Sequence, residues 1–118
     1  MRQVKQLLEN WGIWARCRIG TEYAPVAAGM MEAVEWESRE YRGEWNDDMA
    51  MAVDRAVAEL GQFGEEGQEL KKLLLAHYTC GASARFIARE RKSSPATVTR
   101  EISRAEMWVA GRLSSTFT

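Results

Sequence analysis

Apolar residues along the chain recur at intervals of three and four positions, the spacing of one face of an α-helix. No stretch alternates apolar and polar residues over a length that would favour a β-strand. Up to position 80, the segments predicted as helices are 3–16, 25–36, 46–60 and 65–80. The stretches between the first three of them, 17–25 and 36–46, are predicted to be irregular. The pattern therefore predicts an all-α protein.

The predicted ends of these helices carry residues that suit helix ends. Asn46, followed by two aspartates, can accept hydrogen bonds from the free amide groups of a first turn, and the negative charges suit the helix dipole. Gly61 follows the last apolar residue of the helical pattern over 46–60, and Gly81 follows that of the pattern over 65–80. We therefore expect one helix to end at Leu60 and the next to end before Gly81.

The C-terminal third contains a clear start signal for another helix. Ser94 followed by Pro95 is typical of a capping residue with proline in the first helical position. We predict a short helix over 83–91, a break, and a longer helix from Pro95 to about Leu113. Two helices joined by so short a turn match a helix-turn-helix.

The finer spacing of this segment agrees with that geometry. Ala88 is small where the two helices would cross, and the apolar Val98 and Ile102 follow at ten and fourteen positions. Together with Ile87 they are predicted to form a packed elbow, in which a polar side chain would be left unpaired. The turn departs from the usual pattern, because Lys92 stands where glycine is common.

Length and charge refine this picture. The chain has 118 residues, 46% hydrophobic and 28% charged, which is typical of one globular domain. We expect a single domain over 1–118, with a compact helical body of three or four helices at 1–80 and the helix-turn-helix at 83–113. The net charge is −1, yet residues 81–118 carry seven basic and three acidic residues, against nine and fourteen in 1–80. A basic third of this kind favours a polyanion as partner.

The second helix of the pair is the predicted DNA-reading element. If it enters a major groove, its first turns meet base edges, and Arg100 can donate two hydrogen bonds to guanine. The residues predicted to contact DNA from this helix and its cap are Ser94, Ala96, Thr97, Thr99, Arg100, Ser103 and Arg104. Those predicted to lie beside phosphates are Arg85, Arg89, Arg91 and Lys92. The alternative is that these arginines only keep a surface helix soluble.

Other chemistry is not indicated. Cys17 and Cys80 form no metal-binding pair, and His77 is the only histidine, so we expect no metal site. Glycine-rich phosphate loops and paired nucleophile and base motifs are absent, so we expect neither an enzyme nor a cofactor nor a small-molecule substrate. The sequence opens with no secretory signal and has no apolar run of about 20 residues, so we expect a cytoplasmic protein that does not bind membranes.

The five tryptophans fall into two groups. Trp11, Trp14 and Trp108 lie at helical spacing and are predicted to belong to the core. Trp36 and Trp45 flank the predicted irregular stretch, where they are either part of the core or exposed anchors for a partner.

Five blocks of sequence resemble a known family in their order and spacing. The blocks are Leu-Glu-Asn-Trp-Gly-Ile-Trp-Ala (8–15), Ala-Ala-Gly-Met (27–30), Asp-Asp-Met-Ala-Met (47–51), Leu-Leu-Leu-Ala-His-Tyr-Thr-Cys-Gly (73–81) and Ile-Ala-Arg…Ser-Pro-Ala-Thr-Val…Ala-Glu-Met-Trp-Val (87–109). The family they resemble is the short type of the lambdoid-phage late-gene antitermination protein Q.

The resemblance implies a regulator of phage late-gene transcription. Such a protein binds double-stranded DNA near the phage late promoter, loads onto bacterial RNA polymerase and makes it read through terminators. Its helix-turn-helix is similar to region 4 of sigma factors, which here places the DNA-reading surface at Ser94 to Arg104. The expected location is the host bacterial cytoplasm, at the nucleoid.

Two other functions stay open on the sequence. One is a helix-turn-helix repressor or sigma-like regulator with no role in elongation. The other is a protein-interaction module whose basic helix docks on an acidic partner, which would have no affinity for duplex DNA even at low salt.

Overall fold

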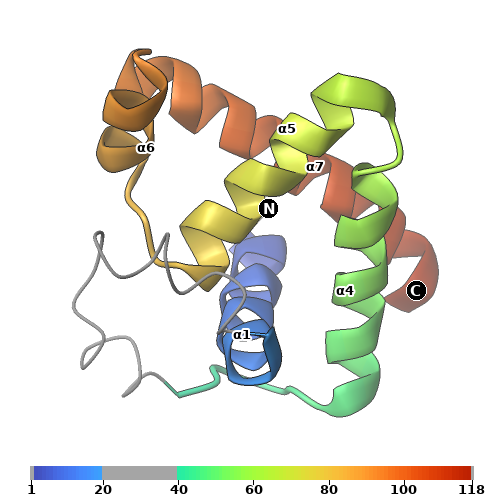
Figure 1. Ribbon diagram of the computed structural model, residues 1–118. Helices are drawn as coiled ribbons and strands as arrows, with labels where there is room; N and C mark the ends of the chain where they lie inside the picture. Colours follow the sequence, from blue (N-terminus) through green and yellow to red (C-terminus); the bar gives the residue numbers. More distant parts are fainter. Residues whose placement is uncertain (1, 20–39, 118) are drawn as a thin grey trace.

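The computed structural model describes residues 2–19 and 40–117, and every regular element in that part of the chain is a helix (Figure 1). The elements are α1 (Arg2–Ile19), α4 (Asp47–Leu60), α5 (Gly64–Leu74), the π-helical turn η2 (Leu75–Thr79), α6 (Ala84–Arg91) and α7 (Pro95–Phe117). The prediction of an all-α protein is confirmed for these residues. The predicted helix at 25–36 and Trp36 lie outside them.

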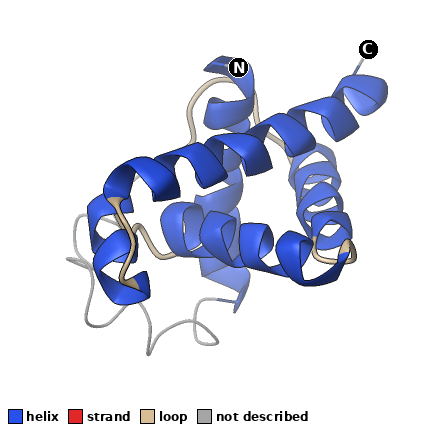
Figure 2. Ribbon diagram, turned by 90° about the horizontal axis from the view of Figure 1, so that it is seen from above, coloured by secondary structure: helices blue, strands red, loops and turns tan. Residues whose placement is uncertain are grey.

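The longest helix, α7, holds the others together. It packs against α1, α4, α5 and α6, and α1 also packs against α4 and η2. In Figure 1, α6 lies at one end of α7 and α4 stands on the opposite side of the molecule. Figure 2, seen from above, shows α7 running across the other helices. The α6–α7 corner is therefore carried at the edge of a body built from α1, α4 and α5.

The core draws on every one of these helices. Its largest fully buried side chains include Trp11, Leu8, Leu60, Leu73, Leu74, Val53, Val57, Val98 and Val109. The prediction for Trp11 is confirmed, and its indole Nε1 donates a hydrogen bond of 3.2 Å to Asp54. Trp14, Trp45 and Trp108 are half-buried and pack against the core. Trp45 is thus partly covered by the body rather than freely exposed.

The helix ends follow the predicted signals closely. Asn46 caps α4, its side-chain oxygen accepting from the amide of Met49 at 2.9 Å. This helix ends at Leu60, as predicted, and residues 40–46 carry no helix or strand. The predicted irregular stretch from position 17 was wrong for 17–19, because α1 continues to Ile19. The helix that starts at Pro95 likewise continues beyond Leu113, to Phe117.

The predicted helix over 65–80 has two parts. It begins at Gly64 as an α-helix and widens at Leu75 into the π-helical turn that ends at Thr79. Gly81 follows with φ +76°, a conformation that glycine adopts without strain. At Gly12, α1 approaches η2 so closely that a side-chain Cβ would lie 2.0 Å from the carbonyl oxygen of Tyr78. Only glycine fits there. Glycine lowers the intrinsic stability of α1, and in return it allows α1 and η2 to pack closely.

Candidate nucleic-acid interface

Helices α6 and α7 meet at a corner formed by three residues, Lys92, Ser93 and Ser94. Lys92 has φ +57° and ψ +43°, the left-handed conformation that usually belongs to glycine at the end of a helix. The amide of Ser93 donates to the carbonyl of Ala88 at 2.9 Å, which closes the last turn of α6. The usual turn has glycine at this position. Lys92 stands there instead, and its backbone adopts the left-handed conformation that the turn requires.

The predicted elbow is buried. Ala88 and Val98 are 1% and 2% exposed, and Ile87 and Ile102 are each 5% exposed. A small side chain at 88 lets the two helices approach, and the apolar side chains of α7 close the angle between them. The same face of α7 then continues into the core of the body. Apolar packing in the elbow thus fixes the orientation of α6 relative to α7.

The start of α7 is capped as the sequence predicts. Ser94 Oγ accepts from the amide of Thr97 at 3.1 Å and lies 2.9 Å from the Thr97 hydroxyl oxygen. One of the Ser94 and Thr97 hydroxyl groups donates its hydrogen to the other. The second hydroxyl hydrogen is available to an acceptor of a bound partner. Pro95 has no N–H, and the amides of Thr97 and Val98 donate to Ser94, so the amide of Ala96 and this hydroxyl are the donors of the first turn that suit an anion.

Most of the predicted DNA-contacting residues on α6, the turn and the start of α7 are exposed. Ser94, Ala96, Thr99 and Arg100 are exposed, while Thr97 and Ser103 are half-buried. Arg85, Arg89 and Lys92 are exposed on α6 and the turn. Within the described residues, no carboxylate pairs with these three or with Arg100. We call Arg85, Arg89, Lys92 and Arg100 the open cations of the corner.

The other two predicted arginines are held by the body. Arg91 pairs with Glu69 at 2.8 Å, and Arg104 pairs with Glu66. Both glutamates belong to α5, which crosses α7 beside the corner. Sequence reasoning missed them because they lie 22 and 38 positions from their arginines. The only signal was their spacing of three, which puts them on one face of α5.

The second half of α7 carries a different surface. Arg112 pairs with Glu59 of α4 and lies over the ring of Trp108, 5.8 Å from its centroid. Phe63 packs edge-on against the same ring at 5.5 Å and is itself 64% exposed. Met107 is 61% exposed. This part of the helix presents apolar and already paired side chains, in contrast to the open cations of the corner.

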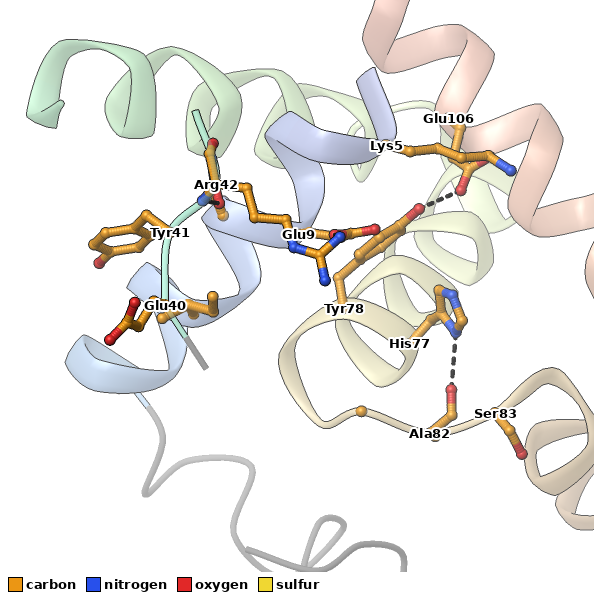
Figure 3. A pocket seen from close by; sticks show the side chains of 13 residues that line it. Lys5, Glu9, Glu40, Tyr41, Arg42, His77, Tyr78, Ala82, Ser83 and Glu106 are labelled. Atoms are coloured by element: carbon orange, nitrogen blue, oxygen red, sulfur yellow. Dashed lines mark hydrogen bonds and ion pairs between the residues drawn. The ribbon is translucent and has the colours of Figure 1, made fainter. Parts of the chain in front are cut away.

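A polar cleft of about 820 Å³ lies between α1, η2 and α7 (Figure 3). On one wall, the hydroxyl of the buried Tyr78 donates to the carboxylate of Glu106, which is 3% exposed. Burial, and then the hydrogen bond to Glu106, raises the pKa of Tyr78 well above its usual value, so the phenol stays protonated and donates. His77 Nδ1 faces the carbonyl oxygen of Ala82 at 2.8 Å. These bonds tie η2 to its neighbours and place no nucleophile beside a base.

The remaining chemistry-bearing groups add no reactive site in the described part of the chain. Burial raises the pKa of the Cys80 thiol, although Arg16 acts in the opposite direction. Across residues 2–19 and 40–117, no three or more histidine, cysteine or acidic side chains gather as metal ligands would. Among the same residues, no helix combines the length and the apolar character needed to cross a bilayer.

In the described residues, fold and site together define a helical body with a basic two-helix corner at its edge. The comparison of its sequence with known proteins then gives the family. The sequence matches the family "Phage antitermination protein Q" over residues 1–117, so the chain belongs to the phage antitermination protein Q family. The resemblance predicted from the five sequence blocks is confirmed, and with it a regulatory role in phage transcription antitermination.

Individual relatives agree with this assignment. The chain is 32% identical over 114 residues to "Probable antitermination protein Q" of Acyrthosiphon pisum secondary endosymbiont phage 1, covering 96% of this chain and 75% of that protein. It is 30% identical over 114 residues to "Antitermination protein Q" of Escherichia phage 933W, and equally to that of Enterobacteria phage VT2-Sa, covering 96% of this chain and 76% of each relative. No solved structure matches the chain.

Proposed function

We propose that this protein is a phage late-gene antitermination factor that binds promoter-proximal double-stranded DNA through the α6–α7 corner, used as a helix-turn-helix. In this proposal it also binds bacterial RNA polymerase in the host cytoplasm, and the polymerase then reads through terminators. Family membership supports the antitermination role. The geometry of the corner supports the DNA contact, and binding rather than catalysis is its mode of action.

The observation that carries the DNA contact is the set of open cations. The chain as a whole has slightly more acidic than basic residues, 17 against 16. Nevertheless, Arg85, Arg89, Lys92 and Arg100 gather at one corner with no carboxylate partner among the described residues. Phosphate groups of a duplex are the partners that such a cluster fits, because each contact releases a counterion from the DNA.

The start of α7 is suited to reading bases. Arg100 is the sixth residue of this helix and is exposed on the face opposite the buried Val98 and Ile102. Ala96 and Thr97 lie on the same outer face one turn earlier, where small side chains allow close approach to base edges. The packed elbow holds this face at a fixed angle to α6. Arg100 is therefore the side chain we assign to guanine recognition.

Removing Arg100 tests the DNA contact most directly. We expect Arg100→Ala to weaken binding to late-promoter DNA by about ten- to hundred-fold in a band-shift assay, with altered base preference. The matched control is Arg55→Ala, because Arg55 is an exposed arginine on α4, on the opposite side of the molecule from α6 (Figure 1). Equal binding by Arg100→Ala and the wild-type chain would contradict the proposal.

The elongation role needs a separate measurement. Transcription with purified RNA polymerase, on a template that carries the phage's own late promoter followed by a terminator, should give longer transcripts when the protein is added. A repressor or sigma-like regulator would change the amount of transcript without carrying it past the terminator. A pure protein-interaction module would show no duplex binding in the band-shift assay even at low salt.

A further inference from the structure

Two of the arginines at the corner are already bound to carboxylates, although they remain accessible. Arg91 and its partner Glu69 are 33% and 50% exposed at their side chains, and Arg104 and its partner Glu66 are 57% and 65% exposed. Both pairs thus lie at the molecular surface, where an approaching phosphate can compete for the guanidinium group. A carboxylate and a phosphate bind arginine through the same hydrogen bonds, so one guanidinium fully engaged by a carboxylate is lost to DNA.

We infer that Glu66 and Glu69 restrain DNA binding by acting as internal competitors of the phosphate backbone for Arg104 and Arg91. The inference rests on the proposed DNA contact and deepens it. Phosphate contacts carry affinity without sequence information. Carboxylates that occupy these arginines therefore lower the affinity for every duplex and leave base recognition to the first turns of α7.

Stability does not account for these pairs. Ion pairs as exposed as these contribute little to the free energy of unfolding, because water screens the charges. The helix dipole favours acidic residues in the first turn of α5, which explains Glu65 and Glu66 equally well. It does not explain Glu69, which lies further along the helix, nor why Glu66 rather than Glu65 meets an arginine. The pairing itself is what distinguishes these two glutamates.

The two competitors differ in what happens when DNA displaces them. Glu69 also lies 3.5 Å from the ammonium group of Lys72, so it keeps a cation nearby after Arg91 turns to a phosphate. Glu66 has Arg104 as its partner and no second cation among the described residues. Displacing Glu66 therefore leaves a carboxylate uncompensated beside the duplex. We expect Glu66 to restrain binding more strongly than Glu69.

The test measures how tightly variants of the full chain bind a late-promoter duplex and a duplex of random sequence, over a series of salt concentrations. Glu66→Gln keeps the shape of the side chain and removes its charge. We expect it to bind both duplexes about two- to five-fold more tightly than the wild-type chain. The slope of log affinity against log salt should steepen by up to about 0.9, the value for one phosphate contact, to the extent that Glu66 keeps Arg104 from the duplex in the wild-type chain. Glu69→Gln should shift both quantities in the same direction by less.

Glu65→Gln is the matched control. Glu65 is the exposed neighbour of Glu66, carries the same charge and has no arginine partner among the described residues. We expect it to change the affinity less than two-fold. In a chain that also carries Arg104→Ala, the gain from Glu66→Gln should shrink to that of Glu65→Gln, since no freed guanidinium remains.

Four outcomes overturn the inference. Equal effects of Glu66→Gln and Glu65→Gln would mean that only overall charge matters. Weaker DNA binding by Glu66→Gln would make Glu66 a residue that positions Arg104 for DNA, which is the opposite role. A wild-type chain that binds no duplex at low salt would overturn the proposed function together with this inference. Binding that depends on Arg100 but is unchanged by Glu66→Gln would overturn this inference alone.

Discussion

In the first half of α7, from Pro95 to Arg104, charged side chains face outward, and Arg100 has no acidic partner in the described part of the chain. In the second half, Glu106 is buried and accepts a hydrogen bond from Tyr78, while Arg112 pairs with Glu59. A single continuous helix thus carries Arg100 without an acidic partner and Arg104 in an exposed ion pair with Glu66 in its first half, and partnered Glu106 and Arg112 in its second.

The difference separates two uses of charge. A buried carboxylate is tolerated only with a hydrogen-bond donor, because burial of an unpaired charge is costly. An exposed arginine needs no partner for stability and keeps its hydrogen-bonding capacity for a ligand. The charged side chains of the second half of α7 therefore serve the body, and the outer face of the first half is left free to bind. Substitutions in and around the helix test this division, and the largest effect is expected at the elbow.

The strongest contrast lies within one turn of the helix. Ile102 is 5% exposed in the elbow, so Ile102→Ala should lower the free energy of unfolding by about 2–5 kcal/mol. Arg100→Ala, at an exposed position two residues earlier, should change it by no more than about 0.5 kcal/mol. Urea unfolding of the two variants measures both values. A large loss of stability in Arg100→Ala would show that this arginine belongs to the body and would remove the division.

The buried pair gives the next effect. Tyr78→Phe removes the hydroxyl that donates to Glu106 and leaves a buried carboxylate without that donor. We expect it to lower the free energy of unfolding by about 1.5–3 kcal/mol at neutral pH. Tyr41→Phe is the control, because Tyr41 is 44% exposed and should cost much less. Similar losses in the two variants would mean that the Tyr78–Glu106 hydrogen bond stabilises the fold no more than an exposed hydroxyl does.

The same pair predicts a response to alkaline pH. An unfolded tyrosine ionises near pH 10, whereas burial raises the pKa of Tyr78 in the folded chain well above that value. The stabilising contribution is therefore complete below about pH 10 and declines as the pH rises further, by at most about 1.4 kcal/mol per pH unit. Unfolding measured across this range should show the gap between the wild-type chain and Tyr78→Phe narrowing. A difference in unfolding free energy that stays constant with pH would contradict a raised pKa of Tyr78 in the folded chain.

The smallest effect concerns the turn. Lys92 has a left-handed backbone, so Lys92→Gly should relieve strain and raise the free energy of unfolding by up to about 1 kcal/mol. The same change removes an open cation and should make the salt dependence of DNA binding shallower by about 0.9. Lys92→Ala is the control, because it loses the charge and keeps the strained backbone. A gain in stability from Lys92→Ala would contradict this explanation.

Local signals in the sequence predicted local structure well. Asn46 and Ser94 each accept the capping hydrogen bond that their positions indicated, and Ser83 accepts the equivalent bond at the start of α6. The elbow followed from the spacing of Ala88 and Val98, because burial of both is set by helical periodicity. The residues of the corner therefore follow from short-range patterns alone, and their exposure agrees with an outer surface.

Features that depend on distant partners could not be predicted in the same way. No pattern pairs Arg104 with Glu66 or Tyr78 with Glu106, since each contact depends on how α5, η2 and α7 cross in space. The π-helical turn at Leu75–Thr79 was also missed, because its apolar residues keep a spacing that suits an ordinary helix. Which arginines are open is decided by this crossing of helices, and short-range patterns carry no information about it.

The unbroken course of α7 has one more consequence. Its 23 residues extend over about 35 Å, close to the length of one turn of duplex DNA. Because the helix is continuous from Pro95 to Phe117, it fixes the distance between its two ends. A duplex bound at the first turns of the helix and a protein bound near its last turns would be held at a fixed separation of about 35 Å or less.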